Sequence, residues 1–136
     1  MKEKVFVDTD IIYDVLAIRE PFYQSAAILF TLADEEKITI TISALSFANI
    51  YYLLSKELSG EQAKQILRKF RILIKIAPID DKIIDLALNS DFSDFEDAVQ
   101  HFCAIENECA IILTRNLKDY KKAQIPVMTA QDYINL

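Results

Sequence analysis

Residues 5 to 14 read VFVDTDIIYD, and this stretch decides which kind of fold the sequence predicts. The short apolar run from Val5 to Val7 predicts a strand, and residues 9–16 follow it with the spacing of a short helix. Asp8 stands between them, where a carboxylate serves about equally well as a helix cap or as a ligand at the rim of a sheet. A strand that leads directly into a helix predicts an α/β protein.

The rest of the chain continues this alternation of strands and helices. Further strands are predicted at 38–42 (ITITI), 73–77, 110–113 and 127–128. Further helices are predicted at 22–36, 44–56, 61–70, 80–88, 95–106 and 129–134, with caps at Ser43, Ser59 or Gly60, Asp80, Ser93 or Asp94, and Thr129. We therefore expect one three-layer α/β/α domain over residues 1–136, with a central, mostly parallel sheet of about four to five strands.

Bulk composition narrows the classes of function. The 136 residues are 52% hydrophobic, carry a net charge of −6 and contain two cysteines. No run approaches the ~18 apolar residues of a membrane span, and unpaired cysteines suit a reducing compartment, so we expect a cytoplasmic protein with no membrane partner. The negative charge disfavours nucleic-acid binding unless cations neutralise a carboxylate pocket, or unless basic side chains gather on one face, as residues 64–75 suggest.

Polar side chains follow three of the predicted strands. In open parallel sheets, ligands bind at the carboxyl ends of the strands, where the strand order reverses. The residues that follow these strands are Asp8 and Asp10, Ser43 and Ser46, and Thr114, Arg115 and Asn116. A site is expected where they meet.

Residues 90–99, SDFSDFEDAV, hold four acids in seven positions. Asp94 and Asp97 would share a helix face, and acids in a first turn often only complement the helix dipole. That explanation fits Asp97 less well, because the apolar residues of this helix should carry the same face toward the core. Carboxylate oxygens suit Mg²⁺ or Mn²⁺. Asp8 and Asp97 together therefore indicate metal-assisted phosphodiester hydrolysis.

Other chemistry-bearing residues are better explained by structure. His101 could act as a general base, but a solvent-facing or hydrogen-bonded helix residue is the favoured interpretation. Phe47, Tyr51 and Tyr52 are expected in the core rather than as a platform for stacking bases.

Four stretches of the chain resemble the PIN domain family of metal-dependent nucleases, which includes the VapC-type toxins. They are VFVDTDIIYD at 5–14, TISALSFANIYYLL at 41–54, DFEDAVQHFCAIENECAIILTRNLKDY at 94–120 and IPVMTAQDYI at 125–134. The resemblance implies a Mg²⁺- or Mn²⁺-dependent endoribonuclease with a parallel sheet, often a homodimer. It also implies RNA as substrate and, for a toxin of a toxin–antitoxin pair, an antitoxin protein as partner.

The resemblance also implies which residues form the site. The acid after the first strand maps to Asp8, the acid of the late helix to Asp97 with Asp94 beside it, and the hydroxyl after the fourth strand to Thr114. The family usually has Glu where this chain has Asn49, and often Asp where it has Asn116; Asp119 follows shortly after. We expect Asn49 and Asn116 to complete or orient the shell around the metal.

Two alternatives follow from these residues. The amides at Asn49 and Asn116 favour a catalytically weakened, PIN-like module that binds RNA or protein without cutting. Residues 7–10, VDTD, also look like the opening of HAD-type phosphatases, in which Asp8 would be the nucleophile and Asp10 the acid/base. The second alternative is less favoured, because the chain is short for that family.

Overall fold

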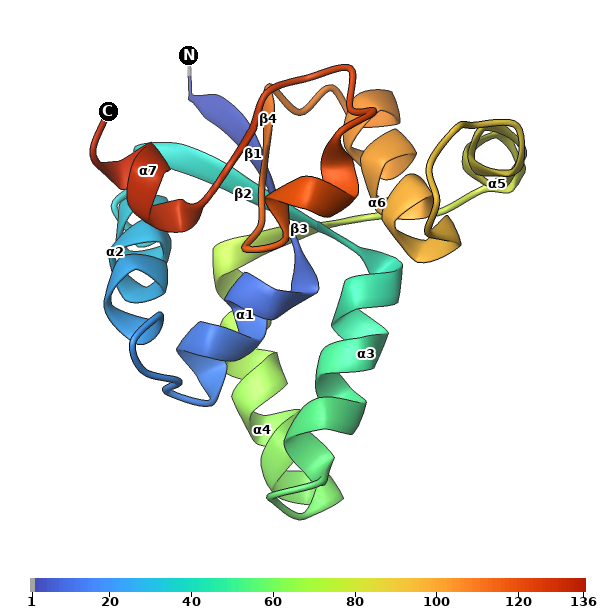
Figure 1. Ribbon diagram of the computed structural model, residues 1–136. Coiled ribbons are helices and arrows are strands. Elements are labelled where there is room, and N and C mark those ends of the chain that lie inside the picture. The colour runs from blue at the N-terminus through green and yellow to red at the C-terminus, as the bar shows by residue number, and fades with distance from the viewer. Residues whose placement is uncertain (1) are drawn as a thin grey trace.

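The computed structural model describes residues 2–136 as a five-stranded sheet between layers of helices (Figure 1). The strands are β1 (Glu3–Val7), β2 (Ile38–Ser43), β3 (Ile74–Ala77), β4 (Ile111–Leu113) and β5 (Val127–Met128). The helices are α1 (Thr9–Leu16), α2 (Tyr23–Asp34), α3 (Ala44–Ser55), α4 (Gly60–Phe70), α5 (Asp81–Leu88), α6 (Phe95–Glu106) and α7 (Ala130–Ile134), with short 3₁₀ helices η1 (Arg71–Leu73) and η2 (Leu117–Tyr120).

The sheet is parallel throughout, with the order β3-β2-β1-β4-β5. The chain builds outward from β1 to β3 and then returns to place β4 on the other side of β1. The strand order therefore reverses between β1 and β4. Val7 pairs with Leu113 at the carboxyl ends of these strands, and the Asp8 amide donates to the Leu113 carbonyl at 2.9 Å. The next residues along, Asp8 and Thr114, consequently lie side by side where a ligand site is expected.

Alternate residues of the strands feed two separate hydrophobic layers. Val5 and Val7 face a core formed with α1, α2, α3, α4 and α7, whereas Phe6 faces a second core formed with α5 and α6. Because both faces are covered, consecutive residues are buried at 5–7 in β1 and at 111–113 in β4, as in other buried parallel sheets. The predicted three-layer α/β/α class is confirmed.

The predicted elements are all present, with small differences at their ends. Ser59 resolves the uncertain start of α4, since its side chain accepts from the Gln62 amide in a capping box. β3 begins at Ile74, one residue later than predicted, because residues 71–73 form η1. The η2 helix after β4 was not predicted. Across residues 2–136, every helix is too short or too polar to cross a bilayer.

Candidate functional site

Asp8 lies at the reversal point of the sheet and is held by four neutral donors. Its Oδ1 accepts from the Thr9 amide at 2.8 Å and from Gln100 Nε2 at 3.2 Å. Its Oδ2 accepts from Thr114 Oγ1 at 2.9 Å and from the Tyr120 hydroxyl at 3.2 Å. Asp8 is buried and caps α1, so the cap interpretation is correct, and its role as a metal ligand stays a prediction. Its charge is oriented but not neutralised.

A chain of hydroxyls extends this network toward α3. Gln100 Nε2 also donates to Ser46 Oγ at 2.6 Å, and Ser46 Oγ lies 2.7 Å from Thr9 Oγ1. Ser46 itself is fixed at the start of α3, because its amide donates to Ser43 Oγ. Gln100 is almost fully buried, and its Oε1 has no hydrogen-bond partner. Sequence reasoning missed Gln100; the signal was a polar residue on the buried face of α6, three positions after Asp97.

Asp10 lies beside Asp8, against the loop that follows β4. Its Oδ2 accepts from the Arg115 amide at 3.0 Å and from Asn116 Nδ2 at 3.4 Å, and Thr114 Oγ1 lies 3.5 Å away. Its Oδ1 is buried without a partner. Burial, followed by the charge of Asp8, raises the pKa of Asp10 to about 6, although the Arg115 amide opposes this shift.

Asp97 belongs to the same electrostatic cluster, although it comes from the other end of the chain. Asp94 caps α6, with its Oδ1 accepting from the Asp97 amide at 2.9 Å. Burial, followed by the negative charges of Asp94, Asp8 and Asp119, raises the pKa of half-buried Asp97 to about 7. None of the ion pairs found among residues 2–136 involves Asp8, Asp94 or Asp97. Within residues 2–136, the carboxylates of Asp8, Asp94 and Asp97 therefore have no ion-pair partner.

The residues present suit a hard divalent cation only in part. Within residues 2–136, no three His, Cys, Asp or Glu side chains converge closely enough to form a complete metal site. Mg²⁺, however, is usually held by one or two carboxylates, with waters and substrate phosphates supplying the other ligands. The oxygen-only donor set, the unpartnered Asp10 Oδ1 and the raised pKa of Asp97 fit such an open site.

The two asparagines lie at the rim of this cluster. Asn49, on α3, donates through Nδ2 to Glu96 Oε1 at 3.4 Å. Asn116 is exposed, and its Nδ2 points to Asp10. Its amide also donates to Thr114 Oγ1 at 3.1 Å, which helps to orient that hydroxyl toward Asp8. Asn49 is thus brought to the acidic first turn of α6, and Asn116 to Asp10 in the first turn of α1.

His101 fits the favoured interpretation of a hydrogen-bonded helix residue, whereas the expectation that Tyr52 lies in the core is wrong. His101 is fully buried rather than solvent-facing; its Nε2 accepts from the Gln124 amide at 3.0 Å, and its ring packs 4.9 Å from Phe92. Burial lowers the pKa of His101 to about 4, so the ring stays neutral and serves as a structural acceptor. Tyr52 is 66% exposed and does not belong to the core, whereas Phe47 and Tyr51 pack against it as expected.

The comparisons with known proteins agree with this architecture. A family model described as PIN domain matches residues 4–118. Ribonuclease VapC1 of Aquifex aeolicus (strain VF5) is 25% identical to this chain over 136 residues, which cover 96% of the chain and 93% of that protein.

Solved structures are similar in fold at lower identity. VapBC2 from Rickettsia felis, bound to a DNA fragment from its promoter, matches with a TM-score of 0.65 and 21% identity over 92% of this chain and 96% of the other. FitAcB from Neisseria gonorrhoeae matches with a TM-score of 0.71 and 13% identity over 93% and 98%. The HAD-type hypothesis gains no support from these matches.

Proposed function

The chain belongs to the PIN domain family, and from this membership we propose that it is a Mg²⁺- or Mn²⁺-dependent endoribonuclease that hydrolyses RNA phosphodiester bonds. One observation carries the proposal: the charge of Asp8 acts on Asp97, from the other end of the chain, and none of the ion pairs found among residues 2–136 involves either acid. Similarity to Ribonuclease VapC1 supports RNA as the substrate. An RNA substrate would place the activity in the cytoplasm.

Asp8 and Asp97 would hold the cation, with Asp94 beside them. When bound, the cation would supply positive charge to the phosphate and lower the pKa of a water. The chain's own residues prepare the site for this. Gln100 and Thr114 fix both oxygens of the Asp8 carboxylate. Asn49 and Asn116 would orient neighbouring acids, Glu96 and Asp10, through their amide groups.

A catalytically weakened binding module is the second candidate. The observation that favours it is the presence of amides at Asn49 and Asn116, which bring no negative charge to the rim of the cluster. Fewer acids lower the affinity for a divalent cation. Such a module would bind RNA or a protein without metal-dependent cleavage.

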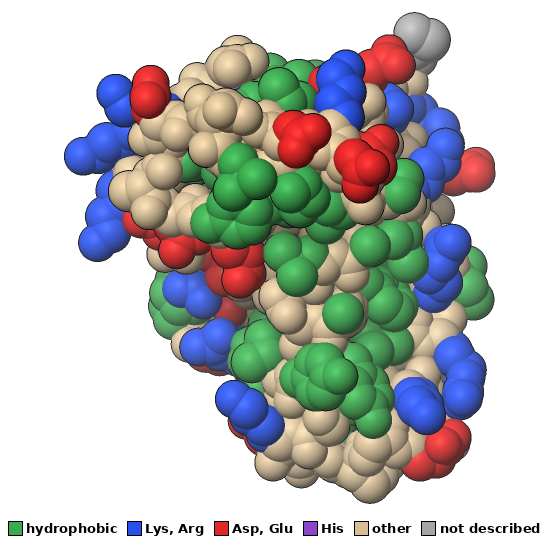
Figure 2. Space-filling view, turned by 90° about the vertical axis from the view of Figure 1, so that its right-hand side faces the viewer, with side chains coloured by type: hydrophobic (Ala, Val, Ile, Leu, Met, Phe, Trp, Pro, Cys, Tyr) green, Lys and Arg blue, Asp and Glu red, His purple; other side chains and the backbone are tan. Residues whose placement is uncertain are grey.

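We also propose assembly with an antitoxin protein and with a second copy of the chain. The antitoxin is suggested by the Rickettsia felis VapBC2 complex. The second copy is suggested by apolar side chains that gather over α3, α5 and α6 between acidic and basic side chains (Figure 2). Exposed apolar side chains of these three helices include Tyr52 of α3, Leu88 of α5 and Phe95 of α6, and large exposed apolar patches mark interaction sites. Light scattering would contradict the dimer by reporting the monomer mass of 15.6 kDa.

The central experiment compares RNA cleavage with Mg²⁺, with Mn²⁺ and with a chelator. Asp8→Asn and Asp97→Asn should each lower kcat/KM by more than roughly 100-fold, the upper end of the losses seen for residues that only support a metal ligand. Asp85→Asn, an exposed acid on α5, is the matched control and should behave as the parent. Calorimetric titration with Mn²⁺ reports cation binding separately.

Two outcomes would reject the assignment. If Asp97→Asn cleaves RNA as fast as the parent, Asp97 is not part of the site. If the parent binds RNA but neither cleaves it nor binds Mn²⁺, the weakened binding module replaces the nuclease.

A further inference from the structure

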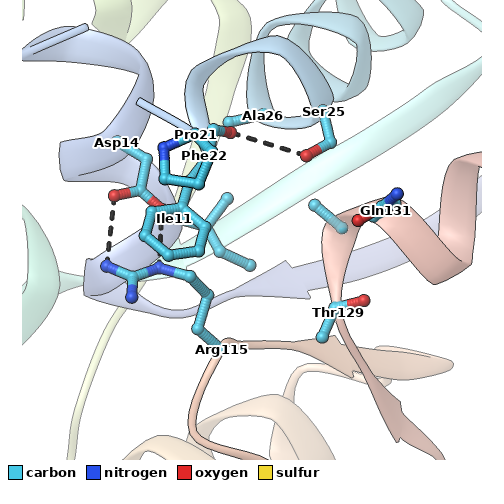
Figure 3. A pocket seen from close by; sticks show the side chains of 10 residues that line it. Ile11, Asp14, Pro21, Phe22, Ser25, Ala26, Arg115, Thr129 and Gln131 are labelled. Carbon is cyan, nitrogen blue, oxygen red and sulfur yellow. Dashed lines mark hydrogen bonds and ion pairs between the residues drawn. The ribbon is translucent and has the colours of Figure 1, made fainter. Parts of the chain in front are cut away.

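A pocket of about 380 Å³ lies beside the acidic cluster, between α1, the connection to α2, α2 itself and the start of α7. Figure 3 shows the ring of Phe22 over the guanidinium of Arg115, with Thr129 and Gln131 on the opposite side of the pocket. Ile11 and Ala26 contribute apolar surface to its wall. The pocket therefore combines an aromatic ring, a cation and neutral polar groups.

Arg115 joins this pocket to the proposed site. Its backbone amide donates to Asp10 Oδ2 at 3.0 Å, while its side chain lines the pocket. The guanidinium donates to both oxygens of Asp14, from Nε at 2.8 Å and from Nη2 at 3.2 Å, and its central carbon lies 3.9 Å from the centre of the Phe22 ring. The pocket thus begins one side chain away from Asp10, whose charge adjoins that of Asp8.

Two guanidinium groups gather around the buried Asp14 carboxylate beside the pocket. Asp14 is only 1% exposed and is paired with two guanidinium groups, Arg115 and the more distant Arg19 at 3.8 Å. Two cations face this one carboxylate, while the charge of Arg115 also acts on Asp10. The chain as a whole has a net charge of −6, and the residues proposed to hold the cation are acidic. A positive group next to the acidic cluster is where a phosphodiester backbone would be attracted.

Phe22 offers an aromatic ring on which the base of a nucleotide can stack. It is 38% exposed although Arg115 stacks on it, so part of the ring remains available to a base. Single-stranded RNA is recognised by stacking on aromatic rings and guanidinium planes and by hydrogen bonds to base edges. Ser25, Thr129 and Gln131 line the same pocket and can supply such hydrogen bonds.

We propose that this pocket is a nucleotide subsite, in which an unpaired nucleotide next to the scissile phosphodiester stacks on Phe22 while its phosphate lies against Arg19 and Arg115. The inference rests on the proposed ribonuclease function. It adds where the nucleotide next to the scissile phosphodiester binds, beside the acidic cluster. It also implies that the enzyme cuts in single-stranded segments, because a paired base cannot enter the pocket.

The test uses the full chain, a panel of fluorescent single-stranded RNA oligonucleotides and Mg²⁺. Phe22→Ala should raise KM about 5- to 150-fold, which corresponds to the loss of one base stack of roughly 1–3 kcal/mol, and should change kcat by less than about twofold. Phe22→Tyr should restore the parent KM, since it keeps the ring. Ile28→Ala removes an exposed apolar side chain from α2, outside the pocket, and should leave KM unchanged.

Two binding measurements address the nucleotide without cleavage. In chelator, 4-thiouridine RNA should photocrosslink to peptides that contain Phe22 or Gln131. Arg19→Gln should reduce the dependence of log affinity on log salt by about 0.7, the value for one phosphate contact on a single strand.

The outcomes separate this subsite from the proposed function. Metal-dependent cleavage with an unchanged KM in Phe22→Ala overturns the subsite and leaves the nuclease standing. Crosslinks that fall only on other elements also overturn it. A parent protein that neither binds nor cleaves RNA overturns both proposals. If Phe22→Ala weakens only the binding of a protein partner, the pocket belongs to that partner and the nucleotide assignment is wrong.

Discussion

Asp8 is oriented by neutral groups rather than by cations, and Gln100 is the buried member of that set. Gln100→Glu keeps the size of the side chain but removes the Nε2 donor to Asp8 and Ser46. It also places a second buried acid against Asp8. We expect a 10- to 100-fold loss of Mn²⁺ affinity, the range for residues that support metal ligands, and a loss of stability of roughly 1–3 kcal/mol from unsatisfied buried groups.

Calorimetry and urea denaturation measure these two effects separately. Gln65→Glu makes the same chemical change at an exposed position of α4 and should alter neither quantity. Parent-like Mn²⁺ affinity in Gln100→Glu would show that Gln100 does not position Asp8.

Single residues differ in how far the sequence reveals them. Asp8 and Thr114 could be predicted as neighbours because they end strands on either side of the reversal in strand order. Asp97 stood out because an acid was expected against an apolar helix face. Gln100 and Tyr120 contact Asp8 across 92 and 112 positions. Helical spacing marks such residues as buried, but it does not say which atom they will meet.

At the scale of elements, Asp14 ties α1 to the loop after β4. Its carboxylate is 1% exposed and accepts two hydrogen bonds from Arg115, whose side chain is 27% exposed. Asp14→Ala should therefore lower the free energy of unfolding by roughly 2–3 kcal/mol, somewhat less than the 3–5 kcal/mol lost when a fully buried pair is broken. Urea denaturation measures the change. Asp85→Ala on α5 is the control and should stay within about 0.5 kcal/mol of the parent; an equal, small effect at both positions would contradict the role of Asp14.

Helix starts were the elements best predicted, because their signals are local. Ser43, Ser59, Asp80, Asp94 and Thr129 each accept a hydrogen bond from an amide in the first turn of the following helix. The two 3₁₀ helices were missed, since three- or four-residue turns carry no periodicity. In η2, the position of Tyr120 depends on burial against Phe92 and Asp8 rather than on local propensity.

At the scale of the whole molecule, the order of the strands determines the site. Alternating strands and helices predicted a parallel sheet, but the order β3-β2-β1-β4-β5 depends on which strands pair over long separations. That order brings the acids of α6 next to Asp8. It also concentrates negative charge in one place, which has a consequence for stability.

Acid clustering should make the metal-free protein less stable as the pH rises. Asp97 and Asp10 have pKa values of about 7 and about 6 in the folded chain, against 3.8 as the ordinary value. The folded state therefore holds more protons on these groups than the unfolded state between pH 4 and 7. Stability from these two groups is complete below about pH 4 and is lost as the pH passes through 6 and 7.

His101 makes the opposite contribution to the pH dependence of stability, and the variant Asp97→Asn separates it from the contribution of Asp97. Its pKa of about 4, against 6.5, means that the unfolded state binds the additional proton, so its contribution to stability rises with pH between 4 and 6.5. The plot of unfolding free energy against pH contains both contributions in the parent. The contribution of His101 cancels when the values for Asp97→Asn are subtracted from those for the parent. Asp97→Asn should gain stability relative to the parent as the pH rises from 4 to 7, measured by urea denaturation in chelator.

Above pH 7, adding Mg²⁺ should reverse the difference in stability between Asp97→Asn and the parent. A cation that binds the ionised cluster stabilises the folded state by mass action, and it gains most where the carboxylates have lost their protons. Adding Mg²⁺ should therefore raise the free energy of unfolding of the parent more at pH 8 than at pH 5. The same addition should change that of Asp97→Asn only weakly at either pH. The difference in unfolding free energy between the parent and Asp97→Asn could instead stay constant from pH 4 to 7. That result would mean that the charges of Asp8 and Asp94 do not act on Asp97, and it would contradict a divalent-cation site at the acidic cluster.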